Sequence, residues 1–250
     1  MFCLGRGAHG IVYQVEHENI QYAMKISNRN SRKEYEIFET MKNYINEHRT
    51  DIRIIHMFDI NGFILSRQVG KILNKNQLCQ MRYITHVFMQ LSIGHKLGLV
   101  HRDVRMYNLI SFNDEYVYLI DWNSSTSNGY NGRYEGAFLT ASMPVLVDYE
   151  ASRGQQVSAY YADDCVSVIY MLLLSSCTRK EELELKECAY CSDAGRLIVH
   201  RRQILRRYPK EILDRLHHIE QNRAHLTDID DLHHQCQQII QVMFTHGLVS

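Results

Sequence analysis

Two short segments of the chain hold side chains that could bind a metal ion and orient a hydroxyl group. The first spans His101–Asn108 and contains Asp103, with the amide of Asn108 five residues later. The second spans Tyr118–Asn123 and contains Asp121. Each carboxylate adjoins an apolar, strand-like run. This pattern predicts a site that holds Mg²⁺ on a triphosphate and orients a hydroxyl nucleophile beside it.

Glycines and a lysine lie upstream, where phosphate contacts would be needed. Gly5, Gly7 and Gly10 precede the β-branched run Ile11–Val15. At this spacing in a dinucleotide-binding fold, glycines open a helix and an acidic residue follows about twenty residues later. Here a strand follows, which predicts a hairpin turn where backbone N–H groups can approach phosphate oxygens that a Cβ would obstruct. An ordinary glycine-rich turn, with Lys25 as a solvated strand lysine, is the alternative.

These residues together resemble the protein kinase family over roughly the first two-thirds of the chain. In motif form they are similar to its casein-kinase-1-like and vaccinia-related branch, and the compact chain also resembles streamlined viral or effector kinases. The resemblance implies a kinase that transfers the γ-phosphate of ATP to Ser or Thr hydroxyls of a protein substrate, with Mg²⁺ or Mn²⁺ as the metal ion.

The resemblance also implies a role for each candidate residue. Asp103 orients the nucleophile or accepts its proton, and Arg105 offsets charge near the γ-phosphate. Asn108 and Asp121 bind the metal ion. The residues that would contact the nucleotide are Gly5, Gly7, Gly10, Val12, Ala23 and Lys25. Glu34 would hold Lys25 against the phosphates, because Ile37 and Phe38 place it on the inward face of a helix, and Glu36 is the alternative partner.

Four positions depart from the family's pattern. Asn123 replaces the glycine after the metal-binding aspartate, and Trp122 replaces a phenylalanine there. Asn tolerates a positive φ better than most residues, so we expect the metal loop to keep its shape. Arg105 replaces a lysine, and a guanidinium fork is not a point charge. Ala137 stands where a threonine usually bonds the catalytic aspartate.

These departures leave two other functions open. A pseudokinase would act as a nucleotide- or partner-binding module and transfer little phosphate. A small-molecule kinase of related fold is the other alternative, although such enzymes usually lack the three-glycine loop present here.

Further residues have supporting roles by the same resemblance. Arg102 is similar to the arginine that senses a phosphorylated activation loop. The candidate acceptors in this chain are Ser124, Ser125, Thr126, Ser127, Tyr130 and Tyr134. Asp164 would hold the catalytic loop by hydrogen bonds to its backbone, and 136–142 is similar to the segment that receives a substrate peptide.

The elements that must position these side chains follow from periodicity. Strands are expected within 2–27, 52–58, 62–66, 108–111 and 116–120, and helices over 31–48, 76–99, 162–174 and much of 178–250. Ser31 and Glu34 form a capping box at the first helix. Residues 122–144 are predicted to form a loop. The expected fold is α+β: a bilobal kinase-like domain over 1–250, with a small antiparallel β lobe carrying one helix (about 1–68), a hinge near Leu65–Gly70 and a mainly helical C-lobe (about 69–250).

Composition limits the other function classes. The 250 residues are 45% hydrophobic and 22% charged, and the 28 Lys and Arg balance the 28 Asp and Glu. The balanced charge therefore does not predict strong electrostatic attraction to a nucleic acid or a membrane surface. Seven scattered cysteines, with no apolar run of about eighteen residues, favour an intracellular protein with reduced thiols. The sequence does not fix the oligomeric state.

Three other clusters of residues are expected to lie outside this site. Cys188 and Cys191 could be half of a zinc site, with Cys177 and His200 nearby, but no second pair follows at metal spacing. The arginines at 201–202 and 206–207 predict a solvated helical face. The histidine pairs at 217–218 and 233–234 are expected at the surface or its boundary.

Overall fold

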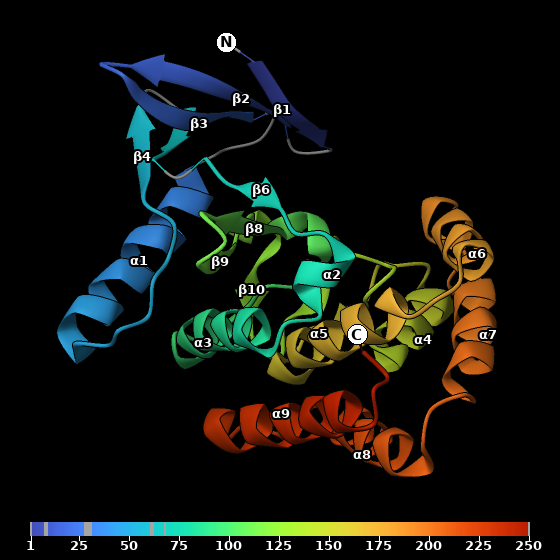
Figure 1. The fold of residues 1–250 in the computed structure, drawn as a ribbon. Coiled ribbons are helices and arrows are strands. Elements are labelled where there is room, and N and C mark those ends of the chain that lie inside the picture. Colours follow the sequence, from blue (N-terminus) through green and yellow to red (C-terminus); the bar gives the residue numbers. More distant parts are fainter. Residues whose placement is uncertain (1, 8–9, 28–31, 61–62, 68, 250) are drawn as a thin grey trace. The chain divides into compact units, whose positions relative to one another are not determined.

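The computed structural model describes residues 2–7, 10–27, 32–60, 63–67 and 69–249. The chain divides into two compact units, each described by itself. The first comprises Met1–Leu73 and Tyr107–Asn123, and the second comprises Asn74–Met106 and Ser124–Ser250. The structure is α+β: antiparallel strands dominate the first unit, and the C-terminal part is mostly helical (Figure 1).

A five-stranded antiparallel sheet of order β1-β2-β3-β5-β4 forms most of the first unit. Its strands are β1 (Phe2–Gly7), β2 (Gly10–His17), β3 (Ile20–Ser27), β4 (Met57–Ile60) and β5 (Phe63–Ser66). The hairpin expected within 2–27 is confirmed, with Val12 opposite Lys25 in the β2–β3 register. The strand expected over 52–58 is wrong at its start, because 52–56 is irregular and pairing begins only at Met57.

Helix α1 (Arg32–His48) follows β3 and buries one face. Glu34, Ile37, Phe38 and Met41 are its buried residues, at the spacing of a helix with one apolar stripe. Ser31, the expected cap, lies outside the described residues. The burial of Glu34 among apolar neighbours is unusual for a carboxylate, which requires a compensating partner.

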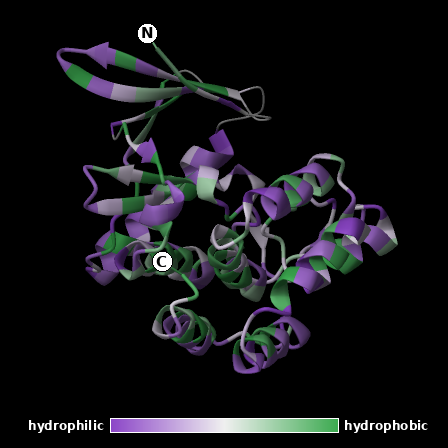
Figure 2. Cartoon of the chain, turned by 45° about the vertical axis from the view of Figure 1, so that its right-hand side comes forward, coloured by the Kyte–Doolittle hydropathy of each residue, from purple (hydrophilic) through white to green (hydrophobic). Residues whose placement is uncertain are grey.

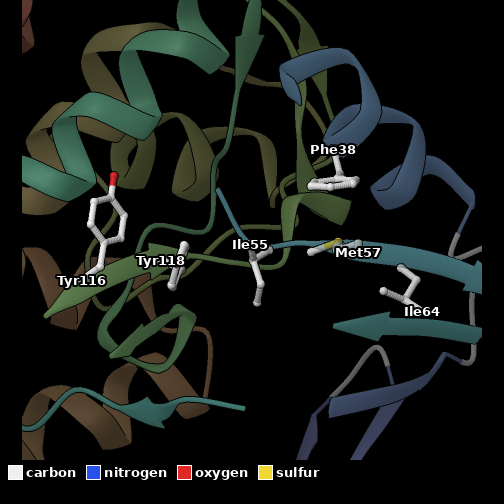
Figure 3. Packing of buried hydrophobic residues seen from close by; sticks show 6 residues of the cluster. All are labelled: Phe38, Ile55, Met57, Ile64, Tyr116 and Tyr118. Atoms are coloured by element: carbon white, nitrogen blue, oxygen red, sulfur yellow. The ribbon is translucent and has the colours of Figure 1, made fainter. Parts of the chain in front are cut away.

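A second, three-stranded sheet of order β6-β8-β9 completes the first unit. Its strands are β6 (Lys71–Ile72), β8 (Leu109–Phe112) and β9 (Tyr116–Leu119), so the hairpin expected over 108–120 is confirmed. Aromatic residues of β9 join side chains from α1, β4, β5 and the irregular stretch before β4 in one buried cluster, shown in Figure 3: Phe38, Ile55, Met57, Ile64, Tyr116 and Tyr118. This shared core explains why a hairpin more than forty residues beyond the first sheet belongs to the same unit.

The second unit is built around helices α3 (Met81–Lys96), α5 (Tyr161–Ser175) and α9 (Ile229–Thr245). The single helix expected over 76–99 is instead two helices. Asn74 caps the short α2 (Lys75–Leu78), because its Oδ1 accepts the N–H of Gln77 at 2.9 Å, and α3 then starts afresh at Met81. Gly98 follows the end of α3 with φ +80, the left-handed conformation that glycine adopts at low cost.

The remaining helices surround this core: α4 (Met143–Ser152), α6 (Arg179–Tyr190), α7 (Ala194–Leu205) and α8 (Lys210–Gln221). The helical character expected for 178–250 is confirmed. In Figure 2, hydrophobic and hydrophilic residues alternate around these helices, as expected of helices with one buried face. Helix α4 was not among the predicted elements, although Ser142 caps it and Pro144 sits in its first turn, the usual start signals.

Short strands lie within and near the segment expected to be a loop. β7 (Leu99–Val100) pairs with β10 (Thr126–Ser127), and β11 (Asn131–Gly132) pairs with β12 (Val157–Ser158). These two pairings fix 126–132 against other segments of the second unit.

The observed units differ from the expected lobes in one respect. The first unit extends to Leu73 and takes in Tyr107–Asn123, where a break near residue 68 was expected. The cause is the pairing of β6 with β8 and the packing of β9 on Phe38. Within the expected hinge, Leu65 and Ser66 belong to β5, and Gln68 lies outside the described residues.

Candidate functional site

A lysine held between two carboxylates forms the centre of the first unit's candidate site. Lys25 Nζ, on β3, lies 2.7 Å from Glu34 Oε2 on α1 and 2.8 Å from Asp121 Oδ1, which follows β9. The three residues come from three separate segments, and Asp121 is 96 residues from Lys25 in the chain. The structure thus brings together three of the residues that the sequence analysis assigned to phosphate and metal binding.

The partner of Lys25 is Glu34, and Glu36 lies elsewhere. The Glu34 side chain is only 3% exposed, whereas Glu36 is 61% exposed and pairs with Arg32 one helical turn before it. The open choice between the two glutamates is therefore decided by helix phase, because only Glu34 lies on the buried face of α1.

Electrostatics keep this lysine charged. Burial opposes the charge, but the two carboxylates outweigh it and raise the pKa of Lys25. Burial raises the pKa of Glu34, and Lys25 acts in the opposite direction by stabilising the carboxylate. Lys25 is therefore a fixed cation at neutral pH, of the kind that can bind phosphate oxygens.

Asn123 has a different role from the one expected of it. It lies in the 3₁₀ turn η2 (Trp122–Ser124) and does not adopt a positive φ. The residue with the left-handed backbone is Asp121, with φ +66. The amide of Asn123 donates to Glu34 Oε2 at 2.9 Å and, more weakly, to Asp121 Oδ1 at 3.4 Å. A glycine could not supply this donor, so the substitution adds a link between the two carboxylates.

Asn108 lies at the same end of the β8–β9 hairpin as Asp121. Leu109 pairs with Leu119, and the N–H of Ile120 then donates to the carbonyl of Asn108 at 2.9 Å. The hairpin register thus fixes both residues beside its open end. An amide and a carboxylate together are oxygen donors of the kind that Mg²⁺ takes, so the donor set fits that ion.

The glycine-rich segment forms the end of the β1–β2 hairpin, and the positions between Gly7 and Gly10 lie outside the described residues. Gly10 has φ +148, and a Cβ there would meet the carbonyl oxygen of Ile26. A Cβ at Gly5 would meet nothing within 4 Å. Gly10 therefore requires glycine for the fold, whereas Gly5 leaves its backbone open to approach. Ala23, on β3, lies opposite Gln14 of β2 and Ser66 of β5.

In the second unit, Asp103 and Arg105 form an ion pair. Arg105 Nη2 lies 3.1 Å from Asp103 Oδ2, and the Asp103 side chain is 6% exposed. The backbone N–H of Asp103 donates to Nδ1 of the buried His101 at 3.2 Å. Asp103 is thus a buried carboxylate with a fixed backbone and a cation beside it.

Asp164, at the start of α5, holds the backbone before Asp103. Its Oδ2 accepts the N–H of His101 at 2.6 Å and its Oδ1 accepts the N–H of Arg102 at 2.8 Å. The structural role expected for Asp164 is confirmed. Arg102 has φ +68, a strained conformation that costs about 1–3 kcal/mol and persists where surrounding contacts impose it.

The side chain of Arg102 contacts the segment 124–135, which also belongs to the second unit. Its Nε donates to the carbonyl of Ser124 at 2.5 Å and its Nη1 to the carbonyl of Arg133 at 3.2 Å, with Glu135 at 3.9 Å. Ser124 is buried with Ser125, whereas Ser127 and Tyr130 are exposed. Exposure thus favours the latter two among the candidate phosphate acceptors.

A threonine hydroxyl contacts the backbone next to Asp103. Thr140 Oγ1 donates to the carbonyl of Val104 at 2.7 Å, and both atoms are buried. Ala137 is buried and brings no hydroxyl. At Gly136 a Cβ would meet the carbonyl of Arg102, so this glycine lets the two segments approach closely.

Two expectations about surface residues are wrong. Arg201 is 1% exposed: its guanidinium donates to the carbonyls of Phe138, Leu139 and Ala141 and lies over the ring of Tyr170. His233 is 7% exposed and contacts His95. Charge and adjacency in sequence suggested solvated faces. The helix phases of α7 and α9 instead turn Arg201, of the pair 201–202, and His233, of the pair 233–234, toward the interior. No sequence signal distinguished Arg201 from Arg202.

No protein-family model matches the chain, and no curated protein matches it. Within the described ranges, no helix is both long enough and apolar enough to cross a membrane.

Proposed function

We propose that the protein is a kinase-like phosphotransferase that moves the γ-phosphate of ATP to a Ser or Thr hydroxyl of a protein substrate. The observation that carries this proposal is the position of Lys25 Nζ, 2.7 Å from Glu34 and 2.8 Å from Asp121. A buried cation held between a helix carboxylate and a post-strand carboxylate is the arrangement that phosphoryl transfer by this family of enzymes uses. On this proposal the two units correspond to the lobes of a kinase fold.

The proposed roles follow from the contacts within each unit. ATP bound with Mg²⁺ would supply the transferable phosphoryl group, and the ion would offset its charge. Lys25 binds phosphate oxygens while Glu34 keeps its ammonium group in place. Asp121 and Asn108 offer oxygens to the ion from one end of the β8–β9 hairpin, and the backbone of Gly5, Gly7 and Gly10, with Val12 and Ala23, faces the nucleotide.

The second unit supplies the groups for the acceptor. Asp103 orients the hydroxyl and takes its proton, in a segment fixed by Asp164. Arg105, whose Nη2 already lies 3.1 Å from Asp103, offsets negative charge as the phosphoryl group moves. Because this transfer needs positioning and charge neutralisation, a rigid loop matters more than a reactive side chain.

The test is transfer from γ-labelled ATP by the purified chain, with Mg²⁺ or Mn²⁺, to itself, to casein and to a basic protein. Asp103→Asn and Asp121→Asn should each lower the rate at least about 100-fold, the usual effect of removing such a group. Asp114→Asn, at the exposed turn of the same hairpin as Asp121, is the matched control and should retain the rate. Incorporation that persists in both site variants would refute the assigned roles.

A nucleotide- or partner-binding pseudokinase is the second candidate, favoured by the buried Ala137, which supplies no hydroxyl where a kinase usually has a threonine. It predicts saturable ATP binding by the folded chain without incorporation. Transfer that Asp103→Asn abolishes would exclude it.

A further inference from the structure

Three metal-ligating side chains converge in the core of the second unit, and neither the sequence analysis nor the proposed phosphotransfer uses them. They are His95 on α3, Cys165 on α5 and His233 on α9, and all three are buried. Their ligand atoms lie within 4.8 Å of one another. Each comes from a different helix, so the packing of the helices, not a local sequence motif, creates the cluster.

Hydrogen bonds fix which nitrogen of His95 can accept. Its Nε2 lies 3.1 Å from Oδ2 of Asp164, which as a carboxylate can only accept, so Nε2 carries the proton. Its Nδ1 therefore has a lone pair, and this atom faces Nε2 of His233 at 2.9 Å. A carboxylate on the far nitrogen of an imidazole is the usual support for a metal-bound histidine, because it orients the ring and increases its basicity.

A second thiol adjoins the cluster. Cys236 is fully buried on α9, one helical turn after His233, and its side chain contacts that of Cys165; its Sγ lies outside the group of three ligand atoms and would shift toward an ion bound there. Two imidazoles and two thiols in an enclosed apolar core form the ligand set that tetrahedral structural zinc sites use. Zn–N bonds of about 2.0–2.1 Å would set the two histidine nitrogens about 3.3 Å apart, a small outward movement from 2.9 Å.

We propose that His95 Nδ1, His233 Nε2, Cys165 Sγ and Cys236 Sγ bind one Zn²⁺ ion in the core of the second unit. The ion would tie α3, α5 and α9 together and replace the hydrogen bond between the two histidines. Both thiols would bind as thiolates, releasing their protons to solvent, and His233, whose Nε2 donates in that hydrogen bond, would move its proton to Nδ1 so that Nε2 can bind the ion. Because His95 also contacts Asp164, the site would brace the carboxylate that holds the backbone of His101 and Arg102. The proposal does not depend on phosphotransfer.

The first measurement is elemental analysis of the intact chain purified without chelator. We expect one zinc per chain. After chelation, Co²⁺ titration should give the visible bands of a tetrahedral ion and a near-ultraviolet thiolate band, both lost when Zn²⁺ is added. Less than one-tenth equivalent of metal together with only an octahedral Co²⁺ spectrum would overturn the proposal, as would copper or another metal in place of zinc.

Variants assign the ligands. Cys165→Ser and His233→Gln should lower the zinc content at least tenfold, and Cys236→Ser should roughly halve the thiolate band. Cys188→Ser is the matched control: it is also buried, on α6, and should retain the metal. Metal lost only with Cys188 or Cys191 would place the ion elsewhere and refute the assignment. If a ligand variant fails to fold, the Co²⁺ spectrum of the unaltered chain still decides the question.

Discussion

Glu220 should make the stability of the protein fall as the pH rises towards 7. This residue of α8 is 7% exposed. Burial raises the pKa of its carboxyl to about 7, although the N–H of Met143 at 2.8 Å, the hydroxyl of Tyr170 at 3.1 Å and the nearby Arg201 act in the opposite direction. Asp163 adds to the rise.

The sign and size of this pH dependence of the unfolding free energy follow from proton linkage. From the ordinary value of 4.5 to about 7 the native state binds a proton that the unfolded state has lost. The stabilisation is complete below pH 4.5 and is lost as the pH rises through 7. At about 1.36 kcal/mol per pH unit, the total is about 3 kcal/mol, of which about 2.5 kcal/mol lies between pH 5 and 8.

Urea unfolding of the unaltered chain and of Glu220→Gln at pH 5 and pH 8 measures the contribution of Glu220 to the unfolding free energy. A glutamine keeps an acceptor for Met143 but does not titrate, so the difference in unfolding free energy between the two proteins should change by about 2.5 kcal/mol across this range. Glu211→Gln, an exposed position on the same helix, controls for the loss of one charge. A difference that stays constant with pH would refute the reasoning.

Three further outcomes are expected from substitutions measured by urea unfolding. Gly10→Ala should destabilise the chain by about 2 kcal/mol, because of its φ of +148 and the carbonyl that a Cβ would meet, whereas Gly5→Ala should stay within about 0.5 kcal/mol; equal effects would contradict the assignment. Arg201→Met should cost about 3 kcal/mol or more, because one buried and two part-buried carbonyls lose their donor; a change below about 1 kcal/mol would refute this. Asn123→Ala should cost about 1.5 kcal/mol and Asn123→Asp more, since a third carboxylate would face Glu34; the reverse order would show that the amide does not serve the network.

The sequence predicted local elements well where a pattern was complete within one segment. The β2–β3 hairpin, the β8–β9 hairpin and α5 follow from alternation and from apolar runs of sufficient length. Prediction failed where a boundary depends on a cap or on a partner strand. The break between α2 and α3 depends on Asn74, and the start of β4 depends on where β5 can pair with it.

For the candidate site of the first unit, residue types and order were sufficient to select Lys25, Glu34 and Asp121, which meet in the structure, because their flanking patterns lie close to them in the chain. The helix phase of α1 then separated Glu34 from Glu36. The role of Asn123 could not be predicted, since its amide acts on a residue 89 positions away and its backbone does not adopt the positive φ that the sequence suggested.

The sequence by itself determined which side chains are available, in what order, and on which kinds of local element they lie. Only the tertiary structure decided which of them meet. The buried Arg201, and the convergence of His95, Cys165 and His233, depend on contacts across 60 to 138 residues of chain. Periodicity indicates which face of a single helix is buried. It does not indicate which segments pack against that face, because that packing is set by the sum of many small apolar contacts rather than by any one motif.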